Sequence, residues 1–102
     1  MIRETGKALD ARIGKEVLHL GNGTPIPAYS TALEYAWQVV DAMRAKGYDF
    51  HFTVKHGGGT QVIFEEIKEA TVICRGTASV HGSAAEAICI AALDAIEKTH
   101  GQ

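Results

Sequence analysis

The sequence predicts an α+β fold in which a three-stranded antiparallel meander is packed by amphipathic helices, in the order ααβββα. Apolar residues recur at helical spacing in two segments before residue 47 and in one segment after residue 83. Between them lie three segments with the alternation or the β-branched content of strands, joined by short connections that are typical of antiparallel neighbours. With one sheet and two long helices to cover it, we expect a layered α/β/α sandwich and a single domain over residues 1–102.

The first helix is predicted over residues 4 to 20. Leu9, Ile13, Val17 and Leu20 follow one another at steps of four, four and three, which places them on one helix face. The segment GNGTPIPAY at residues 21 to 29 cannot continue this helix, because its prolines lack the N–H donor and restrict the residues before them. We expect a loop there.

A second helix is predicted to begin at Thr31, because TALE at residues 31–34 has the pattern of a capping box, with Ser30 as the alternative cap. Gly47 is placed to end this helix in the left-handed conformation. An apolar stripe at helical spacing is expected to face the core, and it consists of Leu33, Ala36, Trp37, Val40 and Met43.

Three strands are predicted in YDFHFTV at 48–54, QVIFEEI at 61–67 and ATVICRGTASV at 70–80. The stretch KHGGGT at 55–60 has the composition of a phosphate-binding loop, but such a loop runs from a strand into a helix, whereas this one lies between two strands. Glycines tolerate positive φ angles, so the stretch is interpreted as a hairpin tip, with a flexible ligand flap as the alternative.

The third helix is predicted from a second capping box at Ser83 through SAAEAICIAALDAIEKTH. Ile88, Ala92 and Ile96 form its main apolar stripe, and Ile90 and Leu93 lie outside that stripe. These extra apolar positions, together with uncovered sheet edges, predict self-association into a homo-oligomer.

Composition narrows the classes of function. A formal net charge of -2 and a pI near 6.2 disfavour binding to duplex DNA, which needs many phosphate-neutralising Lys and Arg side chains. The start MIRETGKALDARIGKEV carries charge throughout, so we expect neither a secretion signal nor a membrane span, and a cytoplasmic location as the default. Cys74 and Cys89 lie in apolar contexts without C-x-x-C spacing, which favours buried reduced thiols.

No motif assigns a cofactor, a metal or a catalytic group, and we expect none of the three. The five histidines show no metal-ligand spacing, and G-x-S-x-G is absent. Glu65 and Glu66 are consecutive on a strand, so they point to opposite faces and cannot work as an acid–base pair. A small hydrolase remains the alternative to a non-catalytic protein.

The first candidate ligand-binding set is the entrance to the second helix, at Tyr29, Ser30 and Thr31. Free first-turn amides and hydroxyls at the positive end of a helix dipole hold anions such as phosphate. The alternative interpretation is that these residues only cap the helix.

The second candidate set combines His51 on the first strand with Arg75 on the third. If both strands flank the second strand in suitable register, the two residues share a sheet face with Glu65. Ordinary salt-bridged or solvated side chains are the alternative. Lys55 and His56, at the hairpin tip, would add a mobile cationic flap over either set.

The segment YSTALEYAWQVVDAMRAKGYDFHF, followed by the meander and AEAICIAALDAI, resembles the phage ABA sandwich domain family, small proteins of phages and prophages with helix–sheet–helix layers. The resemblance covers nearly the whole chain in order, and it rests on the Tyr-Ser-Thr helix entry, the Trp of the second helix and the Ala-Ile-Cys run. Ile90 stands where an Arg commonly follows the Cys, so no role of that Arg is transferred. The resemblance implies a phage origin and this fold, with no established activity.

These observations together predict a non-catalytic phage or prophage accessory protein that acts by binding. The candidate ligands are a small anion, such as a signalling nucleotide of host defence, and a host protein that the phage protein blocks. The alternative is a structural or protein-interaction module of phage assembly.

Overall fold

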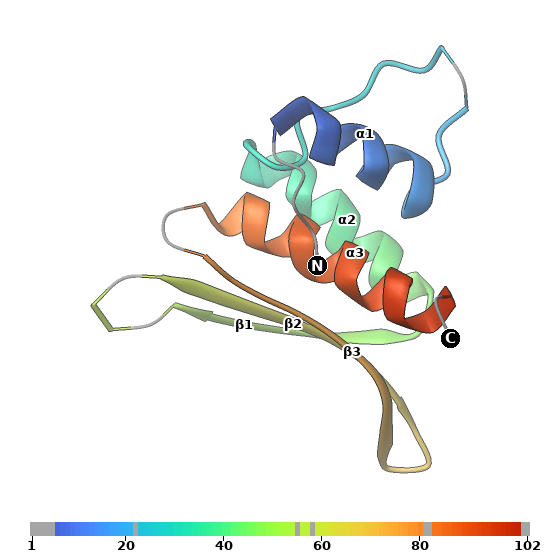
Figure 1. The fold of residues 1–102 in the computed structure, drawn as a ribbon, viewed down its shortest axis with the longest axis vertical. Coiled ribbons are helices and arrows are strands. Elements are labelled where there is room, and N and C mark those ends of the chain that lie inside the picture. The colour runs from blue at the N-terminus through green and yellow to red at the C-terminus, as the bar shows by residue number, and fades with distance from the viewer. Residues whose placement is uncertain (1–5, 22, 55, 58, 81–82, 101–102) are drawn as a thin grey trace.

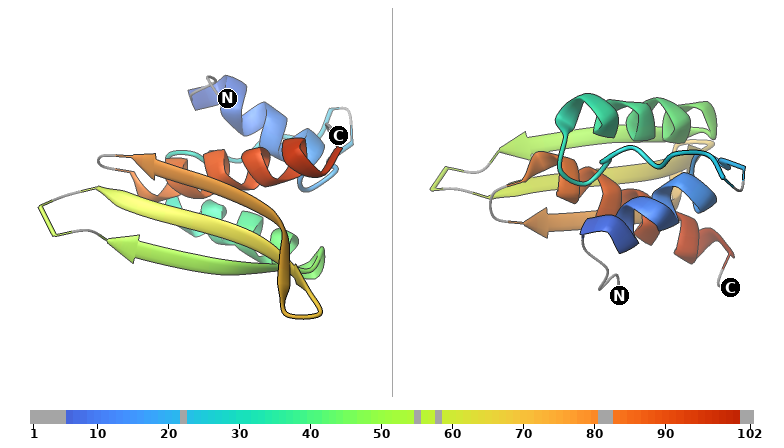
Figure 2. Two further views of the ribbon diagram at one scale, coloured as in Figure 1. Left: turned by 60° about the horizontal axis from the view of Figure 1, so that its bottom comes forward. Right: turned by 90° about the horizontal axis from the view of Figure 1, so that it is seen from above.

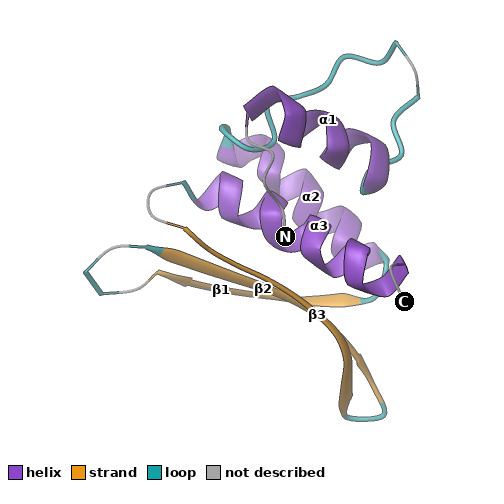
Figure 3. Cartoon of the chain, viewed as in Figure 1, coloured by secondary structure: helices purple, strands orange, loops and turns teal. Residues whose placement is uncertain are grey.

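A computed structural model describes residues 6–21, 23–54, 56–57, 59–80 and 83–100. The elements follow in the predicted order, and their bounds are α1 (Gly6–Glu16), α2 (Leu33–Ala45), β1 (Tyr48–Val54), β2 (Thr60–Lys68), β3 (Thr71–Val80) and α3 (Ala84–His100). The sheet order is β1-β2-β3 with both pairs antiparallel, which confirms the predicted meander. Figure 3 distinguishes the helices from the strands.

The three helices lie on the same side of the sheet, as Figures 1 and 2 show. α2 and α3 pack on the sheet, and α1 lies behind them in contact with α3. The layers of this chain are therefore sheet, helix pair and single helix, which differs from the α/β/α order that we expected. Among the described residues, no helix covers the opposite face of the sheet, which we call the open face.

α3 forms the centre of the core, because it contacts the sheet on one side and α1 and α2 on the others. Most of the surface of this helix is therefore apolar, apart from a partly exposed side with Glu86, Asp94, Glu97 and Lys98. Its buried residues are Ala85, Ala87, Ile88, Cys89, Ala91, Ala92, Leu93, Ala95 and Ile96. Leu93 is fully buried within the chain, and Ile90 is half-buried against the core. The two positions offered as a self-association surface are thus used internally, and the homo-oligomer stays a prediction without that support.

α1 is shorter than predicted but buries the predicted face. Leu9 and Ile13 are fully buried within the helix, and Val17 is buried just after its end. Leu20 lies beyond the helix and is half-buried.

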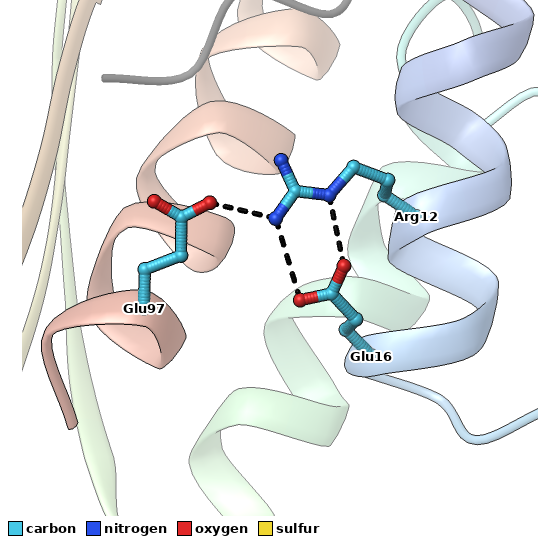
Figure 4. A network of polar contacts seen from close by, with 3 residues as sticks. All are labelled: Arg12, Glu16 and Glu97. Carbon is cyan, nitrogen blue, oxygen red and sulfur yellow. Dashed lines mark hydrogen bonds and ion pairs between the residues drawn. The ribbon is translucent and has the colours of Figure 1, made fainter. Parts of the chain in front are cut away.

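A polar network ties α1 to α3 at the surface of the molecule, as Figure 4 shows. Arg12 Nε donates to Glu16 Oε2 at 2.8 Å, one turn along α1, and Arg12 Nη2 donates to Glu97 Oε2 of α3 at 2.6 Å. One guanidinium therefore bridges two helices that are far apart in the sequence.

The ends of the other helices test the predicted caps. α2 begins at Leu33 with Ala32 as its N-cap and no side-chain cap hydrogen bond, so the capping box predicted at Thr31 is wrong. A turn formed by backbone hydrogen bonds to Ala28 O replaces it. The other two predictions are confirmed: Gly47 has a φ of +101° just past α2, and the Ser83 hydroxyl accepts the N–H of Glu86 at 3.1 Å.

The helix-facing side of the sheet carries Tyr48 and Phe50 of β1 with Val62 and Phe64 of β2. Figure 1 shows that the β1–β2 hairpin projects beyond the ends of the helices. The alternation of apolar and polar residues in β1 therefore continues beyond the helices that cover the sheet. Val54, which this alternation placed on the buried face of the strand, is 68% exposed.

The turns at the two ends of the meander differ in chemistry. Gly57 and Gly59 have φ angles of +88° and +93° between antiparallel strands, so the predicted hairpin tip is confirmed. The β2–β3 turn instead holds Glu69 and Ala70 at φ angles of +53° and +65°, a conformation that favours Asn or Gly.

Candidate functional site

The entrance to α2 is filled by side chains of the same protein. Tyr29 and Ser30 are 1% and 2% exposed. The Ser30 N–H donates to Asp10 Oδ1 of α1 at 2.8 Å, and the Ser30 hydroxyl donates to Gly6 O at 3.4 Å. The Ser30 amide thus holds an internal carboxylate, and binding of an external anion by the first-turn amides of α2 stays a prediction. Of the three predicted residues, only Thr31 is exposed.

We call the hydrogen bond between Asp10 and Ser30 the clasp. Burial also makes the titratable groups around the clasp chemically unreactive. Desolvation, with smaller contributions from the neighbouring Asp10 and Glu86 carboxylates, raises the pKa of the Cys89 thiol to about 12. Desolvation is likewise the main cause that raises the pKa of the Tyr29 phenol. Both groups are neutral at pH 7, so neither is a nucleophile or a base there.

The second predicted set comes together on the open face. The register places Glu65 directly opposite Asp49 on one side and Arg75 on the other, and His51 Nε2 lies 3.1 Å from Glu65 Oε1. The predicted shared face is therefore confirmed, and ligand binding there stays a prediction. Glu65 and Asp49 are like charges directly across the two strands, an arrangement that is unfavourable without compensation.

The hairpin tip is only partly described. His56 is exposed in the β1–β2 turn, whereas Lys55 lies outside the described residues. The cationic flap stays a prediction.

Sequence reasoning missed a groove between α2 and the outer edge of β1. We call it the edge groove; it has a volume of about 510 Å³ and is lined by Trp37, Val40, Asp41, Arg44, Asp49, Phe50 and His51. α2 supplies one wall and β1 the other. His51 belongs to both the edge groove and the open face.

Aromatic side chains form the apolar wall of the edge groove. The Trp37 and Phe50 rings meet edge to face, with centroids 5.9 Å apart, and Phe50 also contacts the rings of Phe52 and Phe64. Trp37 is 45% exposed, although we expected it in the core. The buried face of α2 is instead Ala36, Val39, Val40 and Met43. The helix is therefore rotated relative to the predicted stripe. Val39, an apolar residue that the predicted stripe left out, is the feature of the sequence that could have indicated this rotation.

Apolar surface continues beyond the groove. Leu33, Phe52 and Val54 are 44%, 41% and 68% exposed, and we call these three residues the apolar rim. Leu33 precedes Trp37 by one helical turn, and Phe52 contacts Phe50, so the rim continues the aromatic wall.

β1 is an edge strand of the described sheet, with β2 as its neighbour. Its outward N–H and C=O groups therefore face no other described strand, beneath the wall formed by α2. The charged groups in the groove are Asp41, Asp49, Arg44 and His51, so with a neutral histidine the lining carries two negative charges and one positive charge.

The described residues hold no group of three or more His, Cys, Asp or Glu side chains arranged to bind a metal ion. Within the same residues, none of the helices has the length and hydropathy that a membrane span requires.

The family model for the phage ABA sandwich domain matches residues 10–93, which run from α1 through the whole sheet into α3. The chain belongs to the phage ABA sandwich domain family. The predicted resemblance is confirmed, and the matched region of this phage ABA sandwich protein contains both walls of the edge groove. No curated protein and no solved structure matches the chain.

Proposed function

We propose that this phage ABA sandwich protein acts by binding another protein, without catalysis, and that the edge groove and the apolar rim form the binding surface. The observation that carries this proposal is the exposed edge of β1 beneath the half-exposed Trp37. The proposed partner is a host protein that is blocked by the contact. A phage assembly protein is the alternative partner.

Three properties of the surface favour a protein partner. An unpaired strand edge is a template for pairing with another chain. Trp and Arg are among the residue types that most often dominate binding energy at protein interfaces. The edge groove contains one of each, Trp37 and Arg44. The apolar rim extends the contact beyond the groove, so the surface is longer than a small ligand requires.

A small aromatic anion such as a nucleotide is the second candidate. A base would stack on Trp37, and the Arg44 guanidinium would hold a phosphate. The Asp41 and Asp49 carboxylates oppose the negative charge of such a ligand, which makes it the weaker candidate.

The test compares three forms of the tagged protein expressed in host cells during infection: wild type, Trp37→Ala and Tyr35→Ala. Tyr35 is an exposed aromatic on another face of α2, which makes Tyr35→Ala the matched control. We expect a partner that co-purifies with wild type and Tyr35→Ala but not with Trp37→Ala. Calorimetry with that partner, after purification, should show at least a tenfold loss of affinity for Trp37→Ala.

Native mass spectrometry with a panel of cyclic and linear nucleotides separates the two candidates. A stoichiometric nucleotide adduct that requires Trp37 would move the assignment to small-ligand sequestration. A partner that binds equally to all three forms would place the interface elsewhere and contradict the proposal.

A further inference from the structure

We propose that the edge groove takes its partner as one extended segment, which adds to the sheet beside β1 as a fourth strand. In this segment, apolar residues alternate with polar ones, and a polar position next to Asp49 carries Lys or Arg. The inference rests on the proposed function, since it specifies the ligand of the same groove.

The backbone of β1 supports strand addition. All seven residues of β1 pair with β2, from Tyr48 opposite Glu66 to Val54 opposite Thr60, so the strand is free of bulges along its whole length. Alternate N–H and C=O groups of such a strand point away from β2. An added segment pairs with these groups, as in other complexes formed by β-augmentation.

The position of α2 leaves room for an added strand only if that strand brings no helix of its own to the same side of the sheet. Figure 2 shows α2 running along the β1 side of the sheet, so an added strand lies under its outer stripe. Neighbouring strands lie about 4.8 Å apart, whereas packed helices need about 8–10 Å between axes. Two copies joined through β1 would bring their α2 helices too close, so a second copy cannot continue the sheet at this edge.

The helix-facing side of the added strand meets apolar groups. Phe50 and Phe52 point to that side of β1, and Trp37 stands beside Phe50 with nearly half of its surface exposed. A side chain opposite either phenylalanine is therefore enclosed by rings. Every second residue of the segment is expected to be apolar, because successive side chains alternate between the two faces.

The open-face side meets negative charge. Asp49 is exposed and lies directly opposite Glu65, whose own carboxylate already contacts His51. A strand on the outer side of β1 places a side chain across from Asp49, and a cation is the complementary choice there. On the α2 wall, Asp41 and Arg44 offset each other in charge, so Asp49 sets the preference.

The experiment is selection from a random linear 12-residue peptide display library on the folded protein. We expect enriched peptides that alternate apolar and polar residues and carry Lys or Arg at a polar position. Their affinity should fall at least tenfold when alternate residues on one edge of the peptide are N-methylated, and much less when the other set is methylated. It should also fall at least tenfold with Trp37→Ala and remain with Tyr35→Ala.

Charge reversal tests the position of the cation. Selection on Asp49→Lys should replace Lys or Arg by Asp or Glu at the same peptide position, whereas Glu34→Lys, at an exposed residue outside the groove, should leave the pattern unchanged. Circular dichroism and thermal unfolding show that each variant is folded.

Strand addition and the proposed function fail in different ways. No enrichment, a helical spacing of apolar residues, or insensitivity to N-methylation overturns strand addition. If a folded partner still binds in a Trp37-dependent way, the proposed function stands without it. If neither peptides nor a folded partner depend on Trp37, both proposals are wrong.

Discussion

The hydrogen bond between Asp10 and Ser30 is predicted to be a main determinant of stability, because it holds α1 against the start of α2. Asp10 and Ser30 are 6% and 2% exposed, and the bond length is 2.8 Å. A hydrogen bond to a charged group contributes about 1.5–3 kcal/mol to stability, and a buried N–H left without a partner costs a similar amount. Asp10→Ala should therefore lower the free energy of unfolding by about 2–3 kcal/mol.

Urea denaturation followed by circular dichroism measures this loss. With a slope of about 1.5 kcal/mol per molar urea for a small domain, the midpoint should fall by about 1.3–2 M without a change of slope. Asp10→Asn keeps an acceptor oxygen and should lose about half as much. Asp41→Ala removes an exposed carboxylate from α2 and serves as the control, with a change within about 0.5 kcal/mol. If Asp10→Ala were as stable as Asp41→Ala, the clasp would not hold α1.

Three further predictions concern stability and reactivity. Ala70→Gly should raise the melting temperature by a few degrees, because the αL conformation costs an L-residue about 1–2 kcal/mol and the extra entropy of an unfolded glycine offsets only part of that gain; an unchanged or lower melting temperature would contradict this. The pKa of Cys89 is raised in the folded state, so its contribution to stability is present below the unfolded pKa near 9 and is lost as the pH rises toward about 12. Urea unfolding should therefore show a lower free energy of unfolding at pH 10 than at pH 8, and Cys89→Ala should reduce this difference. Arg12→Met should lower the free energy of unfolding by at most about 1 kcal/mol, and by less in 1 M salt, because Arg12, Glu16 and Glu97 are all partly exposed. A loss that does not depend on salt would point to packing of the arginine stem instead.

The order of the elements could be predicted from the sequence, because each element carries a local signal. Alternation in β1, glycines between the strands, and Gly47 after α2 act over a few residues, and the structure confirms all three. Ser83 acts locally as well, and it caps α3 as predicted. The capping box at Thr31 is wrong because the Thr31 N–H donates to Ala28 O in a backbone turn and α2 begins after Ala32. The turn is also held from a distance, since Asp10, twenty residues before Ser30, accepts the Ser30 N–H.

The candidate site depended on information that is not local. An apolar stripe on α2 fits more than one rotation of the helix, and the choice between Trp37 and Val39 as a core residue is made by the sheet and by α3. The pairing of Glu65 with His51 and its register with Arg75 required the strand order, which sequence reasoning could state only as a condition. The edge groove was missed because it arises from the placement of α2 over an edge strand.

The same layering that differs from the expected α/β/α order explains why the outer side of β1 lies open beneath α2. α3 is apolar over most of its surface, so it takes the central position and places the two other helices around itself on one side of the sheet. α1 packs on α3, where Arg12 binds Glu97, and Asp10 fixes α1 to Ser30 just before α2. The sheet is left with α2 and α3 as its cover. Two helices cover the inner part of three strands, and β1 is an edge strand of the described sheet with exposed aromatic side chains beside it. A sheet edge of this kind is a template for pairing with another chain. The proposed binding surface rests on this edge, which lies beneath the half-exposed Trp37.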